Sequence, residues 1–122
     1  MQVRDNRQQK VQQISRWWAR TKQYTQLSHR LAQGSARQLS RITDFDLCIQ
    51  NLQAQTKAIE TIPYPESASG IRKALLAFML NITTATQHAR FENDDDRNVI
   101  FDIALIDKNM VDIYLSEVGL SL

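Results

Sequence analysis

The segment IRKALLAFMLNITTATQHA, residues 71–89, predicts an amphipathic helix with one continuous apolar face. Apolar residues recur along it at steps of three and four, the repeat that places side chains on one side of an α-helix. No window of the chain shows the sustained two-residue alternation of a half-buried strand, so we expect an all-α fold. The predicted core face consists of Ile71, Ala74, Leu75, Phe78, Met79, Ile82, Ala85 and Ala89.

Helix-breaking residues bound this segment on both sides. Pro63 and Pro65 precede it, and each proline fixes φ and removes an amide donor. The acidic stretch 92–98 follows it and offers N-caps for a further helix, while Gly34-Ser35 marks a third break. We therefore expect a single helical domain, residues 1–122, built as an antiparallel helical bundle of four helices. The predicted helices span about 3–33, 35–61, 67–91 and 96–118.

The last predicted helix is apolar on two rows, which is typical of a helix that packs on two sides. One row consists of Val99, Ile103, Ile106, Met110 and Tyr114, and the other of Ile100, Ala104, Val111, Leu115 and Val118. Leu76, Leu80 and Phe91 also lie off the core face of residues 71–89. The sequence therefore predicts apolar surface that one bundle does not cover.

The first half of the chain carries a longer apolar repeat. Its phase continues across Gly34, which leaves an alternative open: one long N-terminal helix plus a helical hairpin, dimeric so that the seam is covered. Ser35 with Gln38 is typical of a capping box that opens a new helix, so a break at Gly34 is the favoured interpretation. The seven-residue row is Trp17, Tyr24, Leu31, Gln38, Phe45, Leu52 and Ile59.

The two adjacent tryptophans fall on this broad apolar face. We expect Trp17 and Trp18 to fill one end of the bundle core, because each ring buries a large apolar area. An exposed stacking role for Trp18 stays open, since Arg16, Arg20 and Lys22 could hold phosphates beside it.

The net charge of +2 conceals a strong asymmetry. Residues 1–61 hold ten Lys or Arg against four Asp or Glu, whereas residues 62–122 hold five against nine. On a continuous helix, five arginines lie in one sector beside the apolar seam; we call Arg16, Arg20, Arg30, Arg37 and Arg41 the arginine ridge. The ridge predicts an acidic partner, which could be phosphate, anionic lipid or protein.

Metal sites are poorly supported by the sequence. His88 and Glu92 would be one helical turn apart, but two ligands on one helix do not close a site. Residues 94–105 resemble the start of a calcium loop, yet Val99 stands where glycine is required and Leu105 where a glutamate should bind. We expect no metal and no cofactor.

Nucleophilic catalysis is also poorly supported. Cys48 lies between Leu47 and Ile49 and is typical of a small buried hydrophobe. Asp107 projects near the apolar arc of the last helix, where a carboxylate needs a partner, and an ion pair with an arginine of the first half is expected. We expect that the protein is not an enzyme.

The sequence thus predicts a protein that binds other proteins and a second copy of itself, with nucleic-acid binding through the basic N-terminal helix as the alternative. The candidate contact residues are Arg16, Arg20, Arg30, Arg37, Arg41, Trp18, Leu76 and Leu80. No stretch is long and apolar enough for a transmembrane segment, and the N-terminus lacks the apolar core of a secretory signal. With one cysteine and no partner for it, a cytoplasmic location is expected.

Overall fold

The computed structural model describes the backbone of residues 2–122 and the side chains from residue 6 onward. Residues 2–122 contain no β-strand, so the all-α prediction is confirmed. The long helices are α1 (Gln2–Thr21), α4 (Phe45–Thr61), α5 (Ser69–Arg90) and α6 (Asp94–Glu117). The shorter elements are the 3-10 turns η1 (Lys22–Thr25) and η2 (Glu66–Ala68) and the helices α2 (Gln26–Gln33) and α3 (Ala36–Leu39).

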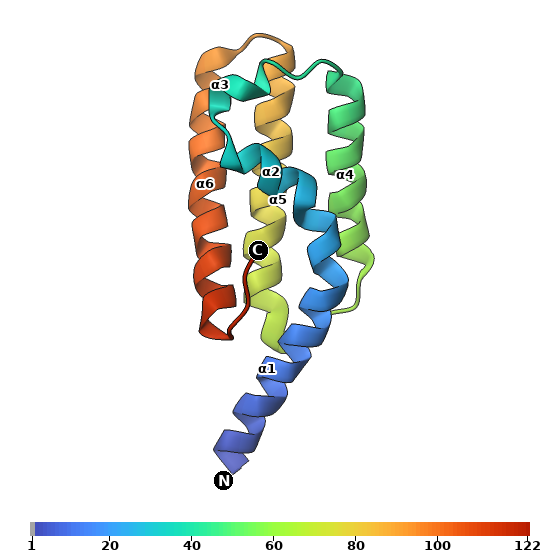
Figure 1. Cartoon of the computed structure of the whole chain (residues 1–122), viewed down its shortest axis with the longest axis vertical. Helices are drawn as coiled ribbons and strands as arrows, with labels where there is room; N and C mark the ends of the chain where they lie inside the picture. The colour runs from blue at the N-terminus through green and yellow to red at the C-terminus, as the bar shows by residue number, and fades with distance from the viewer. Residues whose placement is uncertain (1) are drawn as a thin grey trace.

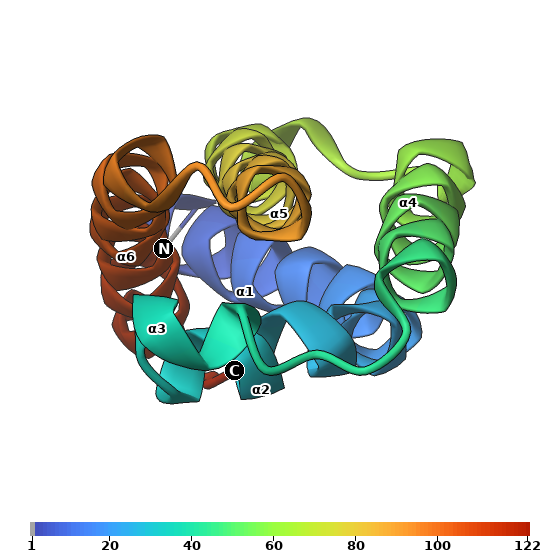
Figure 2. The same cartoon turned by 90° about the horizontal axis from the view of Figure 1, so that it is seen from above.

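The long helices alternate in direction and pack against one another. Helices α4, α5 and α6 lie side by side with α5 in the middle, and the segment from α1 to α3 crosses one face of that layer (Figures 1 and 2). The first turns of α1 extend past the end of the layer (Figure 1), and their side chains from residue 6 to residue 10 are exposed.

Helix α5 supplies the centre of the core, as the pattern of residues 71–89 predicts. Leu75, Phe78, Met79 and Ile82 are fully buried, and the remaining members of its predicted face are buried or, for Ala74, half-buried. The other elements place large side chains against this face. These are Trp17, Leu39, Leu52, Ile59, Val111 and Leu115.

The break at Gly34 is present, so the alternative of one long N-terminal helix is wrong. Helix α2 ends at Gln33, and Ser35 and Gln38 form the capping box that opens α3, with the Ser35 N–H donating to Gln38 Oε1 at 3.2 Å. A Cβ at position 34 would collide with that same Gln38 side chain. A larger residue here would therefore displace the Gln38 side chain from the capping box, whereas the φ of −84° at Gly34 is one that any residue adopts.

The expected helix over 35–61 is interrupted in a way that the sequence analysis did not predict. Residues 40–44 separate α3 from α4, and Asp44 caps α4 by accepting the Leu47 N–H at 3.0 Å. An aspartate that caps a helix start competes with continuing the preceding helix, which accounts for the interruption.

The expected helix over 3–33 contains the 3-10 turn η1. The hydroxyl of Thr21 donates to the Trp17 carbonyl at 2.8 Å, and that of Thr25 donates to the Lys22 carbonyl at 2.7 Å. Bonds of this kind bend helices and accompany 3-10 turns. The seven-residue row is therefore not one straight seam: Tyr24, Leu31 and Phe45 are half-buried at the edge of the core.

Both tryptophans belong to the core, as expected. Trp17 is 2% exposed and Trp18 is 3% exposed. The Trp18 indole N–H donates to the Ser121 carbonyl at 3.1 Å, so the C-terminal tail closes over this ring. Trp18 therefore presents no open ring face for stacking on a base.

Candidate functional site

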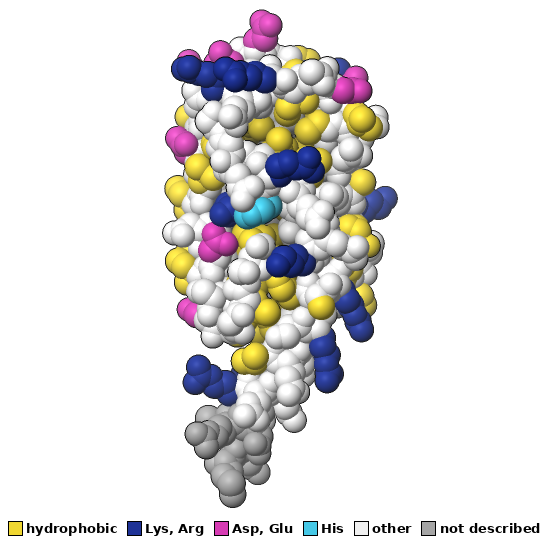
Figure 3. Space-filling view, viewed as in Figure 1, with side chains coloured by type: hydrophobic (Ala, Val, Ile, Leu, Met, Phe, Trp, Pro, Cys, Tyr) yellow, Lys and Arg dark blue, Asp and Glu magenta, His cyan; other side chains and the backbone are white. Residues whose placement is uncertain are grey.

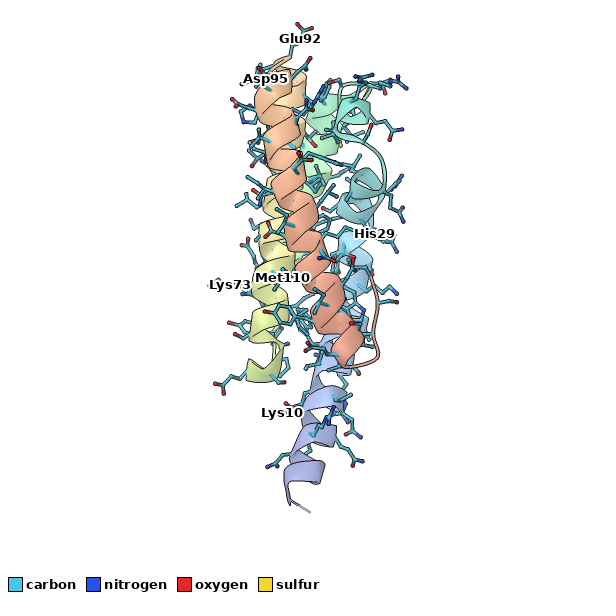
Figure 4. All side chains as sticks on the ribbon, turned by 90° about the vertical axis from the view of Figure 1, so that its left-hand side faces the viewer. Lys10, His29, Lys73, Glu92, Asp95 and Met110 are labelled. Carbon is cyan, nitrogen blue, oxygen red and sulfur yellow. The ribbon has the colours of Figure 1, made fainter. Side chains whose placement is uncertain are left out.

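The first candidate surface is a row of large apolar side chains on the outward side of α6. Residues 99, 103, 106, 110 and 113 follow one another at steps of four and three, the spacing of a helix that pairs with another helix. Figure 4 looks onto this side of the molecule and labels Asp95 near the start of α6 and Met110 further along it. We call Val99 (57% exposed), Ile103 (44%), Ile106 (65%), Met110 (39%) and Ile113 (44%) the outer stripe.

The opposite side of α6 is part of the core. Phe101, Ala104, Val111 and Leu115 are at most 3% exposed. Of the two apolar rows predicted for this helix, the one containing Ala104, Val111 and Leu115 supplies core residues, whereas four members of the other row form most of the outer stripe. Helix α6 packs against α5 and also contacts α2 and α3, but the described elements leave most of the first row exposed. The expected uncovered apolar surface is therefore present on this helix.

Acidic residues surround the outer stripe. Asp102 and Asp107 occupy the positions that flank a helical seam, and Asp96 and Glu117 continue the stripe at its two ends. Over its whole length α6 holds seven Asp or Glu against two Lys or Arg. One of those bases, Lys108, pairs with Asp112 at 3.1 Å and lies near His29 of α2, away from the stripe.

Asp107 does not form the expected ion pair with an arginine of the first half. Its carboxylate accepts a hydrogen bond from the Asn81 amide of α5 at 2.7 Å. The half-buried position of Asp107 explains why a partner is needed, and the neighbouring helix supplies a neutral one.

Arg97, which is 6% exposed, is a buried charged residue that was not among the predicted site residues. Its guanidinium donates to the Ser40 hydroxyl beyond α3, to the Asp94 carboxylate and to the Asn98 amide oxygen. A buried guanidinium needs this many acceptors, so Arg97 fastens the turn after α3 to the first turn of α6.

The second candidate surface is the basic face formed by α1, α2 and α3. Between residues 6 and 43 there are eight Lys or Arg and no Asp or Glu, and all eight are exposed. Within the part of the chain that the structure describes, none of the five ridge arginines takes part in an ion pair. Figure 3 shows basic side chains spread over this face.

The arginine ridge is not the single rail that a continuous helix would give. Arg16 and Arg20 lie on α1, Arg30 on α2, Arg37 on α3 and Arg41 in the turn that follows. The helix breaks between them change the direction of the chain. The ridge is therefore a broad basic face rather than a line of equally spaced charges.

The two leucines predicted as contact residues differ in exposure. Leu80 is 60% exposed on α5, beside a groove of about 340 Å³ between α4 and α5. Leu76 is half-buried and packs against the core. The groove beside Leu80 is lined mainly by polar side chains: Gln53, Thr56, Lys57, Glu60, Thr83, Thr84 and Gln87. Leu80 is therefore a single exposed leucine on the α4 side of α5, outside the outer stripe, and we do not retain it as a contact residue.

Among the residues that the structure describes, Cys48 and His29 have shifted pKa values, and neither shift activates a nucleophile. Burial raises the pKa of the Cys48 thiol, with Arg30 opposing that shift, so the reactive thiolate is disfavoured. Burial lowers the pKa of His29, and the charges of Lys108 and Lys22 lower it further while Asp112 opposes them.

The possible ligand pair His88 and Glu92 does not lie on one helix, because α5 ends at Arg90 and Glu92 has a φ of 58°. Across the described residues, no group of three or more His, Cys, Asp or Glu side chains is placed to hold a metal ion. Nor does any helix there combine the length and the apolar character needed to cross a bilayer. Comparison of the chain with protein-family models, curated proteins and solved structures gives no match.

Proposed function

We propose that this chain is a non-enzymatic helical-bundle protein that acts by binding other protein chains through the outer stripe of α6. The observation that supports this most strongly is the heptad-like order of five large apolar side chains, each at least 39% exposed, on a helix whose other side is core. A soluble protein rarely exposes apolar side chains as one contiguous row unless a partner covers them.

The energy available at this surface is substantial. Burying an apolar side chain of this size is worth about 1.5–3 kcal/mol when it passes fully from water into a packed interface. The five side chains expose between 39% and 65% of their surface, so covering all of them would contribute roughly 4–7 kcal/mol to association. This contribution is set against the entropy lost on binding, and pairing with the acidic residues beside the stripe would add to it. The spacing of the stripe matches another helix as the covering element.

The test is affinity capture of the tagged full chain from cells that produce it, compared with the double variant Ile103→Ser, Ile106→Ser. Leu80→Ser is the matched control, because Leu80 is exposed to a similar degree on the adjacent helix. The proposal expects the double variant to lose its bound proteins while the control keeps them. Unchanged capture by the double variant would contradict it.

Self-association, which the sequence also predicts, would use the same stripe. Sedimentation velocity of the purified chain separates this case from binding of a different protein. A dimer that the double variant abolishes would identify the second copy as the partner.

A cytoplasmic location belongs to the same proposal, because a lone thiol such as Cys48 is most stable in a reducing compartment.

A second candidate function is nucleic-acid binding by the basic face. It is favoured by eight exposed Lys or Arg with no acid among residues 6–43. Phosphate contacts release counterions, so binding of labelled duplex DNA or RNA should fall steeply between about 50 and 200 mM salt. The variant Arg16→Gln, Arg30→Gln, Arg37→Gln should bind more weakly and with a smaller salt dependence. Affinity that is independent of salt would exclude this function.

A further inference from the structure

The geometry and charge of the outer stripe also indicate what kind of chain covers it. We infer that its occupant is a basic amphipathic helix of a different protein, and not a second copy of this chain. The inference rests on the proposed function of α6 as a docking surface and adds the chemistry of the partner.

The shape of the surface selects a helix. From Val99 to Ile113 the stripe covers fifteen residues of α6, and the fourteen rises between them correspond to about 21 Å at 1.5 Å per residue. Steps of four and three align side chains with a second helix that carries apolar residues at the same interval. An extended peptide would contact every second residue and would not match this spacing.

The charge around the stripe selects a basic helix. Asp96, Asp102, Asp107 and Glu117 lie at its ends and flanks. Lys108 pairs with Asp112 of the same helix, and both charges lie near His29 of α2. Residues that flank a helical seam set the choice of partner through charge, and opposite charges across the seam are favourable. Lysine or arginine at the flanking positions of the partner would therefore meet Asp102 and Asp107 beside the stripe and Asp96 and Glu117 at its ends.

A second copy of this chain does not supply that surface. We call Asp96, Asp102, Asp107 and Glu117 the acidic rim of the stripe. Pairing α6 with α6 of a second copy places the two acidic rims against each other, and like charges facing across an interface are unfavourable. Among the described residues, the strongly basic face is residues 6–43, and its exposed side chains there include no large hydrophobic one. This basic face could form ion pairs with the acidic rim of a second copy, but it offers no apolar side chains to cover the outer stripe.

The experiment uses the full chain and two synthetic helical peptides of about 21 residues with the same leucines at the seam positions. One peptide has lysine at the flanking positions and the other has glutamate. Binding is measured by fluorescence anisotropy for the wild type, for Ile103→Ser, Ile106→Ser, for Asp102→Asn, Asp107→Asn, and for the control Leu80→Ser. Circular dichroism establishes that each variant is folded, and the single variant Ile106→Ser replaces the double one if that unfolds.

The lysine peptide should bind the wild type and Leu80→Ser alike, about tenfold more tightly than the glutamate peptide. The variant Ile103→Ser, Ile106→Ser, which we call the stripe variant, should lose about tenfold or more in affinity for the lysine peptide. The variant Asp102→Asn, Asp107→Asn, which we call the rim variant, should reduce the difference in affinity between the two peptides to about threefold or less. Asparagine at 107 keeps an oxygen for the bond from Asn81, so the rim variant tests charge alone.

Two outcomes would overturn the inference and leave the proposed function intact. One is equal binding of both peptides with loss in the stripe variant, because the stripe would then dock helices without regard to charge. The other is a stripe-dependent dimer in sedimentation velocity, because the occupant would then be a second copy. A third outcome would refute both the inference and the proposed function. In that outcome the stripe variant binds both peptides as tightly as the wild type does and also captures the same proteins from cells.

Discussion

Two substitutions on opposite sides of α6, Ile106→Ala and Leu115→Ala, should have very different effects on stability. Leu115 is fully buried, whereas Ile106 is 65% exposed. Truncating a buried leucine to alanine removes transfer energy and leaves a cavity, which costs about 2–5 kcal/mol. At Ile106 about one-third of a full burial energy of 1.5–3 kcal/mol is lost, which is about 0.5–1 kcal/mol. Alanine regains part of that loss because it is the better helix former.

The free energy of unfolding should therefore fall by less than about 1 kcal/mol for Ile106→Ala and by at least about 2 kcal/mol for Leu115→Ala. In a chain of this size the second change corresponds to a decrease of roughly 6–20 °C in Tm. The assay is urea unfolding followed by circular dichroism at low protein concentration, where the chain is free of partners. A loss above about 2 kcal/mol for Ile106→Ala would refute the reasoning, since that residue would then be packed in the isolated chain.

Three further outcomes follow from other parts of the structure. Ser28 is fully buried and its hydroxyl has no hydrogen-bond partner among the described residues. Ser28→Ala should therefore raise the free energy of unfolding by about 1 kcal/mol. A lower free energy of unfolding in urea for this variant would contradict the prediction. Burial lowers the pKa of His29 from its ordinary value of 6.5, so the fold binds fewer protons than the unfolded chain and loses stability as pH falls below that value. His29→Gln should therefore flatten the decline in unfolding free energy between about pH 7 and 5 and leave the value above about pH 7.5 unchanged, which unfolding curves across this range would measure. The variant Arg16→Gln, Arg30→Gln, Arg37→Gln should keep its helicity and its unfolding free energy to within about 0.5 kcal/mol, because all three side chains are exposed, and unfolding of this variant would show that the ridge is structural.

The helical class and the central core face were predictable because their signals are local. The three- and four-residue steps of residues 71–89 require a helix, and the capping box at Ser35 and Gln38 was readable from two residue types at the right spacing. The prolines at 63 and 65 lie in the connection before α5, where a donor-free residue causes no loss of helical hydrogen bonds.

The interruptions within the first half were not predictable from periodicity. A seven-residue row continues in phase whether or not the backbone between its members stays helical. The 3-10 turn at 22–25 and the connection at 40–44 depend on side-chain bonds of Thr21, Thr25 and Asp44 that compete with the helix. Aspartate at a cap is a recognisable signal, and Asp44 could have been considered as one.

The candidate surface was only half predictable. Two apolar rows on the last helix were visible in the sequence, but periodicity does not state which row faces the core. The choice is made by tertiary packing, in which Arg97 fastens the start of α6 to the turn after α3 and Asp107 meets Asn81 of α5. Both contacts join residues far apart in the chain, and no local pattern encodes them.

Photo-crosslinking at Ile106 in cells tests most directly whether the outer stripe contacts another protein chain. A photo-reactive phenylalanine analogue placed at Ile106 is compared with the same analogue at Leu80, which is similarly exposed on α5. We expect a discrete adduct with a different protein from position 106 and none from position 80. Equal adducts from both positions, or no adduct from position 106, would contradict it.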